Sequence, residues 1–257
     1  MKKFTVSVFV AFIMISQPFN LFAWGKKGHG IAAEIAFSLL DTNTKLKIRN
    51  YLKGTSIEDA STWMDEMRSN HSYDYMKPWH YVNVEKGNEY IPDSGANVVN
   101  EIKIAIQNLS HKEKLNDSEI KTNLLVIFHL VEDMQMPLHV GYGSDKGGND
   151  IKVTYLGKPG NLHKVWDTDI IESEGITTGQ CLELLKDISK AERKKWSDIN
   201  IDQWIEEPRS QLKYVYDFNH ETNILDQAYA DRNKPVVERQ LLVAGIRLAA
   251  VLRLVAQ

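Results

Sequence analysis

Two histidine–aspartate pairs at helical spacing place the strongest constraint on the fold of this chain. His129 and Asp133 are four residues apart, and so are His163 and Asp167. If both segments are helical, each pair projects its side chains from one face of its helix. Apolar residues surround both pairs, and unpaired ionisable groups are costly in such surroundings. The pattern therefore predicts two helices that face one shared polar pocket.

The side chains of these pairs are of the types that bind zinc. Imidazole nitrogens and carboxylate oxygens are ligands that zinc prefers, and a carboxylate can also bridge two ions. Pro137 should stop or kink the helix of the first pair, so His139 would reach the pocket from another direction. A single pair at this spacing is also common as a surface contact, so the metal site is a hypothesis about the whole group.

Most of the remaining chain has the periodicity of helices. Apolar residues recur at helical intervals in residues 30–40, 45–52, 57–68, 96–109, 117–136, 162–173, 178–190, 201–218 and 223–230. A final helix is predicted to open with Pro235 in its first turn, and it is apolar almost all round, which places it in the core. Residues 150–156 alternate at a period of two and are the best strand candidate. These patterns predict an all-α fold, a mainly helical single domain with a small β-hairpin.

The first residues have the composition of a signal peptide. Lys2 and Lys3 are followed by the mostly apolar residues 4–15, and Ala23 offers a small residue for cleavage. The apolar run is short for a membrane anchor. We therefore expect residues 1–23 to be removed, and residues 24–257 to form one exported domain without stable membrane insertion. This domain would be a monomer in the periplasm or secreted into the medium.

The net charge argues against one class of nucleic-acid-binding protein, and the cysteine content excludes an intramolecular disulfide. Loss of Lys2 and Lys3 moves the formal net charge from −3 to −5, which argues against a protein that grips nucleic acid by basic residues alone. Bound divalent ions would change this locally, because they add positive charge at the site itself. Cys181 is the only cysteine, so an intramolecular disulfide is excluded.

Four further positions extend the group of candidate ligands. His29 lies between glycines in WGKKGHG, Asp65 in ASTWMDEMR and His80 in KPWHYVN. If export exposes the amine of Trp24, its nitrogen and its own carbonyl oxygen could form a five-membered chelate. Taken singly, the three side chains have ordinary explanations as a loop residue, a solvated carboxylate and a boundary histidine. Together the candidates comprise five histidines, three aspartates and a terminal amine, a set that suits three zinc ions.

The motifs resemble those of the exported single-strand-specific zinc nucleases of the mung bean nuclease type, which share a trinuclear-zinc helical fold with bacterial zinc phospholipases C. The resemblance covers residues 24–257, through WGKKGH, WMDEMR, WHYVN, HLVEDMQMPLH, GGNDI, NLHKVWD and PVVERQLLVAGIRLAAVL. It implies three Zn²⁺ ions. By this resemblance, Asp65, His80 and His129 hold one ion, Trp24 and His29 hold its close partner, Asp133 bridges the two, and His139, His163 and Asp167 hold the third.

The resemblance also implies an activity. We expect an endonuclease and 3′-nucleotidase that hydrolyses phosphodiester bonds of single-stranded RNA and DNA to 5′-phosphorylated products by zinc-activated water. Asp65 would orient this water, and Arg68, where family members often have lysine, would neutralise charge in the transition state. Tyr81 matches the base-stacking aromatic of the family. Asn83 stands where some members have aspartate, which leaves the base preference open.

Two other functions fit the same ligands. A zinc phospholipase C would act on phospholipid head groups, but Tyr81, GGNDI and the C-terminal helix match the nucleases better. A non-catalytic zinc carrier of the exported compartment would need neither open metal positions nor Arg68 near the cluster. Because one fold can serve several functions, the site must decide between them.

Overall fold

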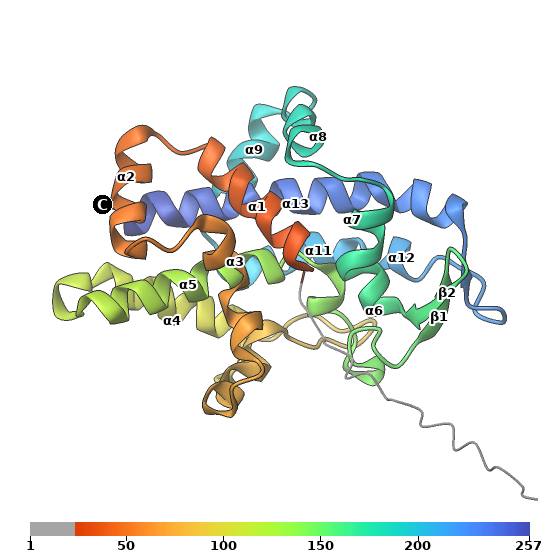
Figure 1. Ribbon diagram of the computed structural model, residues 1–257. Helices are drawn as coiled ribbons and strands as arrows, with labels where there is room; N and C mark the ends of the chain where they lie inside the picture. Colours follow the sequence, from red (N-terminus) through yellow and green to blue (C-terminus); the bar gives the residue numbers. More distant parts are fainter. Residues whose placement is uncertain (1–23) are drawn as a thin grey trace, which may run out of the picture.

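The computed structural model of the protein describes residues 24–257 (Figure 1). The expected signal peptide, residues 1–23, lies outside the described residues. The described chain is mainly helical, as the sequence predicts, and it contains a small three-stranded sheet. None of its helices is both long and apolar enough to cross a membrane.

The long C-terminal helix α13 (Gln227–Val255) runs through the molecule from the sheet to the opposite end, where the chain terminates (Figure 1). Residues 240–252 are all buried, which confirms the prediction of a core helix. Helix α1 (Lys26–Ser38) packs along α13 at Gly245, where an added Cβ would lie 2.3 Å from the side chain of Ile35. The predicted start at Pro235 is wrong, because Asp226 caps the helix by accepting a hydrogen bond from the Tyr229 N–H and Pro235 lies inside it.

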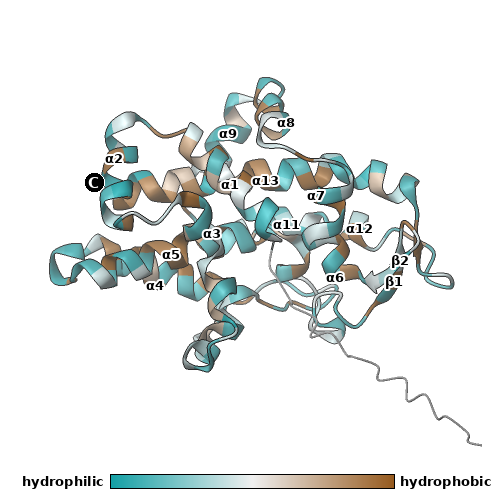
Figure 2. Ribbon diagram, in the orientation of Figure 1, coloured by the Kyte–Doolittle hydropathy of each residue, from teal (hydrophilic) through white to brown (hydrophobic). Residues whose placement is uncertain are grey.

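Two helices that pack beside α1 carry candidate site residues. They are α3 (Ile57–Met67), with Asp65, and α5 (Asp117–Asp133), with His129 and Asp133, and α4 (Val98–Ser110) packs against α5. Asn116 and Glu119 form a capping box that begins α5. The helix ends at Asp133, and a 3₁₀ turn, η3 (Pro137–Val140), redirects the chain as Pro137 predicts. Apolar residues lie along α5 and α13, and hydrophilic residues lie on the outer turns (Figure 2).

The sheet combines a hairpin with one distant strand. Strands β1 (Lys152–Tyr155) and β2 (Lys158–Asn161) are antiparallel, which confirms the predicted hairpin, and β3 (Ile224–Leu225) runs parallel to β1 in the order β2-β1-β3. The predicted helix at residues 223–230 is therefore wrong at its start. The Thr154 N–H donates to the Asn223 carbonyl, and the Leu156 N–H to the Leu225 carbonyl. These bonds pair β3 with β1 and hold Ile224 and Leu225 extended.

The segment after the hairpin is a helix with an irregular centre. Helix α6 (Leu162–Lys164) passes into a π-helical turn, η5 (Val165–Asp169), and continues as α7 (Ile170–Ser173). Asn161 begins it by accepting a hydrogen bond from the Lys164 N–H. Such π turns are frequent at functional sites.

The predicted helix at residues 201–218 is divided into short pieces. They are α10 (Ile201–Trp204), α11 (Glu206–Ser210) and α12 (Leu212–Val215). Pro208 has no N–H to donate to the Trp204 carbonyl, which instead accepts a hydrogen bond of 2.9 Å from Arg247 of α13. The remaining elements are α2 (Thr42–Leu52), η1 (His71–His80), η2 (Lys112–Lys114), η4 (Gly143–Asp145), α8 (Thr178–Glu183), η6 (Leu184–Lys186) and α9 (Lys190–Ser197).

Candidate metal centre

The fold brings the predicted ligand side chains together in three buried groups. Within each group, one ligand atom per residue lies within 4.8 Å of the others. The groups are His29 with His129 and Asp133, Asp65 with His80 and His129, and His139 with His163 and Asp167. Because the first two groups share His129, they form one continuous cluster.

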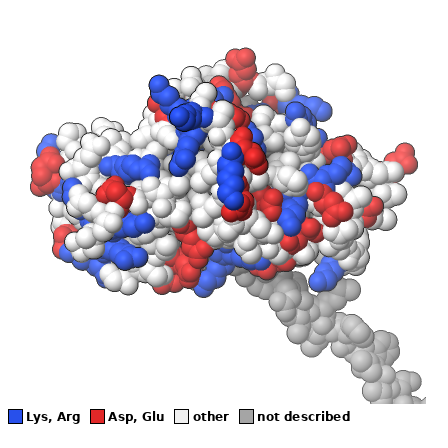
Figure 3. Space-filling model, turned by 90° about the horizontal axis from the view of Figure 1, so that it is seen from above, with Lys and Arg blue, Asp and Glu red and all other residues white. Residues whose placement is uncertain are grey.

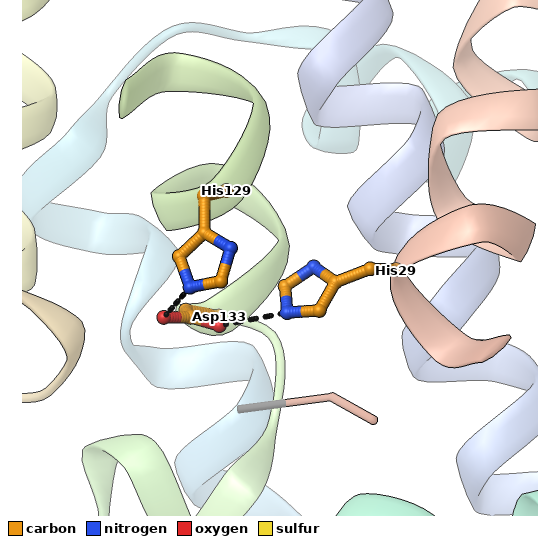
Figure 4. A group of neighbouring side chains, drawn as sticks. All are labelled: His29, His129 and Asp133. Carbon is orange, nitrogen blue, oxygen red and sulfur yellow. Dashed lines mark ion pairs between the residues drawn. The ribbon is translucent and has the colours of Figure 1, made fainter. Parts of the chain in front are cut away.

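Asp133 lies between histidines of two helices (Figure 4). His29 Nε2 is 3.4 Å from Asp133 Oδ1, and His129 Nε2 is 3.3 Å from Asp133 Oδ2. Each oxygen of the carboxylate therefore faces a different imidazole, which is the arrangement that a bridging carboxylate needs. His29 lies in helix α1, so its alternative explanation as a loop residue is wrong. The helix begins at Lys26 and includes both flanking residues, Gly28 and Gly30.

Backbone carbonyls hold three of the other rings. His129 Nδ1 lies 2.6 Å from the Ser61 carbonyl oxygen, His139 Nδ1 is 2.8 Å from that of His80, and His163 Nδ1 is 2.7 Å from that of Gly147. An Nδ1–H that donates to a carbonyl fixes the tautomer and the direction of the ring, as in most metal-binding histidines. His80 differs, because its Nδ1 faces Asp133 Oδ2 at 2.9 Å and His129 Nε2 at 3.0 Å.

Several polar atoms of this cluster lack a hydrogen-bond partner among the described residues. These buried atoms are His29 Nε2, Asp65 Oδ1, Asp133 Oδ1 and Asp167 Oδ1. Burial, followed by the nearby charge of Asp65, raises the pKa of Asp167 well above its usual range. Burial also holds the pKa of His139 well below that of a free imidazole, so its neutral form, which binds metals, is favoured. Cations at these groups would satisfy the unpaired atoms and offset the cost of buried carboxylates.

Trp24 is fixed between the two ligand-bearing segments. Its side chain is fully buried, and the indole Nε1 donates to the Glu132 carbonyl of α5 at 3.0 Å. The next N–H, that of Gly25, donates to the Asp167 carbonyl at 2.9 Å. A side chain at Gly25 would collide with Thr168, because an added Cβ would lie 2.5 Å from its Oγ1. The first described residues are therefore anchored beside the cluster.

Glu132 lies beside this cluster, and the sequence pattern did not identify it as a neighbour of the candidate ligands. Its carboxylate is fully buried, and Oε2 lies 2.5 Å from His29 Nδ1. The available signal was a second acidic residue directly before Asp133, in a helix that is otherwise apolar from Leu124 to Val131 except for His129.

A cavity of about 720 Å³ opens from the cluster to the surface. His80, His139 and His163 line it together with Asp65, and so do the predicted substrate residues Arg68, Tyr81 and Asn83. Further basic and polar residues at its walls are Lys77, Lys146 and Asn149. Arg68 Nε is 3.0 Å from Asp65 Oδ1 as an ion pair, and Tyr81 is 43% exposed. The cavity is thus large enough to admit a nucleotide-sized ligand.

The fold and the buried cluster define a mainly helical domain with side chains that could hold metal ions. The family model of the S1/P1 nucleases matches residues 24–257. The chain belongs to the S1/P1 nuclease family, and it is accordingly a hydrolase that acts on the phosphodiester bonds of nucleic acids.

Named relatives agree with this assignment. Nuclease S1 of Aspergillus oryzae is 29% identical over 91% of this chain and 92% of its own length. Endonuclease 2 of Arabidopsis thaliana is 28% identical over 95% of this chain and 94% of its own length. Nuclease P1 of Penicillium citrinum is 26% identical over 56% of this chain and 57% of its own length. These relatives are named as nucleases and not as phospholipases.

Proposed function

We propose that this protein is an exported, zinc-dependent endonuclease and 3′-nucleotidase that hydrolyses single-stranded RNA and DNA to 5′-phosphorylated products. The observation that supports it most is the convergence of three buried histidine–aspartate groups, two of which contribute side chains to the wall of one open cavity. We further propose that the active form is the domain of residues 24–257, released when residues 1–23 are cleaved as a signal peptide.

The donor set fits three Zn²⁺ ions. Asp65, His80 and His129 would hold one ion, the Trp24 amine and carbonyl with His29 a second, Asp133 would bridge the two, and His139, His163 and Asp167 would hold the third. The buried atoms of His29, Asp133 and Asp167 that lack a hydrogen-bond partner in the described chain support this assignment, since each belongs to a proposed ligand. When bound, the ions would supply water of lowered pKa and positive charge for the phosphate.

Arg68 and Asp65 act together at the wall of the cavity. Asp65 has one oxygen near Arg68, at 3.0 Å, and lies close to His129, so it can hold a proton of the attacking water as well as bind a cation. The Arg68 guanidinium lines the cavity, where its planar fork can bind two phosphate oxygens as negative charge develops.

Tyr81 and Asn83 account for the selectivity for single strands. Both line the cavity, and Tyr81 is exposed enough to offer a ring face to a base. A base can stack on this ring only when it has left its own stack, which is the state of single-stranded nucleic acid. The side-chain amide of Asn83 can then hydrogen-bond to an edge of that base.

The test is metal analysis of the mature protein combined with hydrolysis assays. We expect one zinc ion for each of the three groups, rapid cleavage of single-stranded RNA and DNA, slow cleavage of duplexes, and release of phosphate from 3′-nucleotides. A phosphatidylcholine substrate, assayed in parallel, should remain intact. Absence of transition metal from the active protein, or failure of the metal-loaded protein to cleave any single strand, would refute the proposal.

A further inference from the structure

Glu132 contacts both residues that are proposed to hold the ion nearest the amino terminus. Its carboxylate Oε2 lies 2.5 Å from His29 Nδ1, and both side chains are fully buried. Its backbone carbonyl accepts the indole N–H of Trp24 at 3.0 Å. The next residue, Asp133, faces the other nitrogen of the His29 ring at 3.4 Å.

We propose that Glu132 is a positioning residue for this ion: its carboxylate fixes the ring of His29 while its carbonyl fixes Trp24. The inference rests on the metal-dependent function proposed above. A carboxylate at Nδ1 sets the tautomer and orientation of a histidine and raises the basicity of Nε2, the atom that would bind the metal. His29 Nε2 has no hydrogen-bond partner among the described residues and is directed toward Asp133.

The kind of hydrogen-bond partner separates His29 from three of the four other rings. Nδ1 of His129, His139 and His163 faces a backbone carbonyl oxygen in each case, which no substitution removes. The partner of His29 is a side chain that can ionise. A charge-assisted hydrogen bond is shorter and stronger than one to a neutral carbonyl. His29 therefore differs from these three rings, because its orientation depends on a replaceable side chain. His80 Nδ1 also faces a side chain, but that side chain belongs to Asp133, which is itself a proposed ligand.

Packing alone does not account for a carboxylate at this position. The preceding residues of α5, from Leu124 to Val131, are apolar apart from His129, and Glu132 Oε1 has no hydrogen-bond partner in the described chain. A buried ionisable group is costly, and apolar residues of similar volume often replace such groups with no loss of stability. A purely structural position would be expected to hold leucine or methionine.

Two substitutions at Glu132 and one control test the proposal in the mature, zinc-loaded protein. Glu132→Leu keeps the volume but removes the acceptor, Glu132→Gln keeps an acceptor oxygen, and Glu238→Leu removes a largely buried carboxylate on α13 that pairs with Lys234. Zinc content is measured after dialysis, zinc affinity by competition with a chromogenic chelator, and thermal stability with and without chelator.

We expect Glu132→Leu to lower the zinc affinity of one site by about 10- to 100-fold, the usual cost of removing the hydrogen-bond partner of a metal ligand. Its metal-free form should be as stable as the unsubstituted metal-free protein, or more stable. Glu132→Gln should recover part of the affinity, and Glu238→Leu should bind zinc normally. A structural role would instead lower the stability of the metal-free protein.

Two results would overturn the inference. One is a Glu132→Leu protein that binds zinc as tightly as the unsubstituted protein at every site. The other is an equal loss at all sites, accompanied by lower stability of the metal-free form. Failure of the proposed function is distinguishable, because the unsubstituted mature protein would then bind no zinc or leave single strands intact.

Discussion

Arg68 is the residue whose role is most readily separated from metal binding. It lines the cavity and pairs with Asp65, but arginine is a poor ligand because its guanidinium stays protonated. We predict that Arg68→Ala leaves the zinc content unchanged and lowers kcat on single-stranded DNA by about 10²–10³-fold, the usual cost of losing one donor to a developing charge. Arg68→Lys should retain an intermediate rate. A large loss of zinc in Arg68→Ala would contradict this role.

Tyr81 provides a second test at the level of single residues. Stacking of a base on an aromatic ring contributes about 1–3 kcal/mol, so Tyr81→Ala should raise KM for single-stranded DNA by about fivefold or more. Tyr81→Phe should change little, because it keeps the ring. Tyr75, which is 56% exposed and outside the cavity wall, offers a matched control. If Tyr75→Ala and Tyr81→Ala have the same effect, base stacking at Tyr81 is refuted.

At the level of elements, the loop before β1 places the third group of candidate ligands. Gly147 has φ +59°, its carbonyl oxygen lies 2.7 Å from His163 Nδ1, and an added Cβ would lie 2.4 Å from the Leu138 carbonyl oxygen. Gly147→Ala should therefore displace His163 relative to His139, and remove one zinc ion with most of the activity. Gly157→Ala is the control, because Gly157 also has positive φ (+79°) but no neighbour near its Cβ. Equal zinc loss in both variants would attribute the effect to backbone strain alone.

The amino-terminal segment is a second element with a specific requirement. Trp24 and Gly25 are anchored to α5 and to η5, so the amine of Trp24 would be available only after cleavage before it. One additional alanine before Trp24 should reduce the zinc content by one ion and the activity heavily, with little change in the stability of the metal-free protein. Metal analysis and turnover of the two forms, prepared side by side, measure this. Full activity with the extended terminus would exclude chelation by the amine.

The elements also show what the sequence could and could not predict. The helices of residues 57–68 and 117–136 were identifiable because their apolar periodicity and caps are local. Strand β3 was not, since its extended form depends on pairing with β1, about 70 residues earlier. The start of α13 was misplaced because Pro235 is typical of a first turn, whereas the Asp226 cap is the stronger local signal.

The candidate site was easier to predict than some of its surroundings. Histidines and aspartates at helical spacing in apolar segments stand out, and the structure brings all eight predicted ligand side chains together. Glu132 did not stand out, because an acidic residue near the end of a helix is usually solvated. Its burial depends on the packing of α1 and Trp24 against α5, which is a tertiary contact.

At the scale of the whole molecule, the formal net charge of −3 provides no overall positive field that would attract nucleic acid. Basic and acidic side chains are interspersed on the face seen in Figure 3. The positive side chains that matter are therefore local, at the cavity wall, where Arg68, Lys77 and Lys146 lie. Bound zinc would add to this local positive charge, so removal of the metal should also weaken substrate binding.

The same cluster joins segments that are far apart in the sequence, so metal removal should affect global stability. Candidate ligands from α1, α3, α5 and the turns η1 and η3 meet candidate ligands from α6 and η5. An ion present at a thousand times its Kd stabilises the folded state by about 4 kcal/mol, or roughly 8–16 °C in Tm for a domain of this size. We predict that EDTA lowers Tm by about 8 °C or more and that added zinc restores the original Tm.

The size of this stabilisation should depend on pH. In the metal-free protein, burial raises the pKa of Asp167 well above its usual range, so the folded state binds a proton more tightly than the unfolded state. This contribution stabilises the metal-free fold below the ordinary aspartate pKa and is lost as pH rises. Zinc binding has the opposite dependence, because protons compete for the ligands at low pH. Calorimetry should therefore show the Tm difference between zinc-loaded and metal-free protein narrowing as pH falls from 7 toward 4; a constant difference would refute metal binding by this buried acidic cluster.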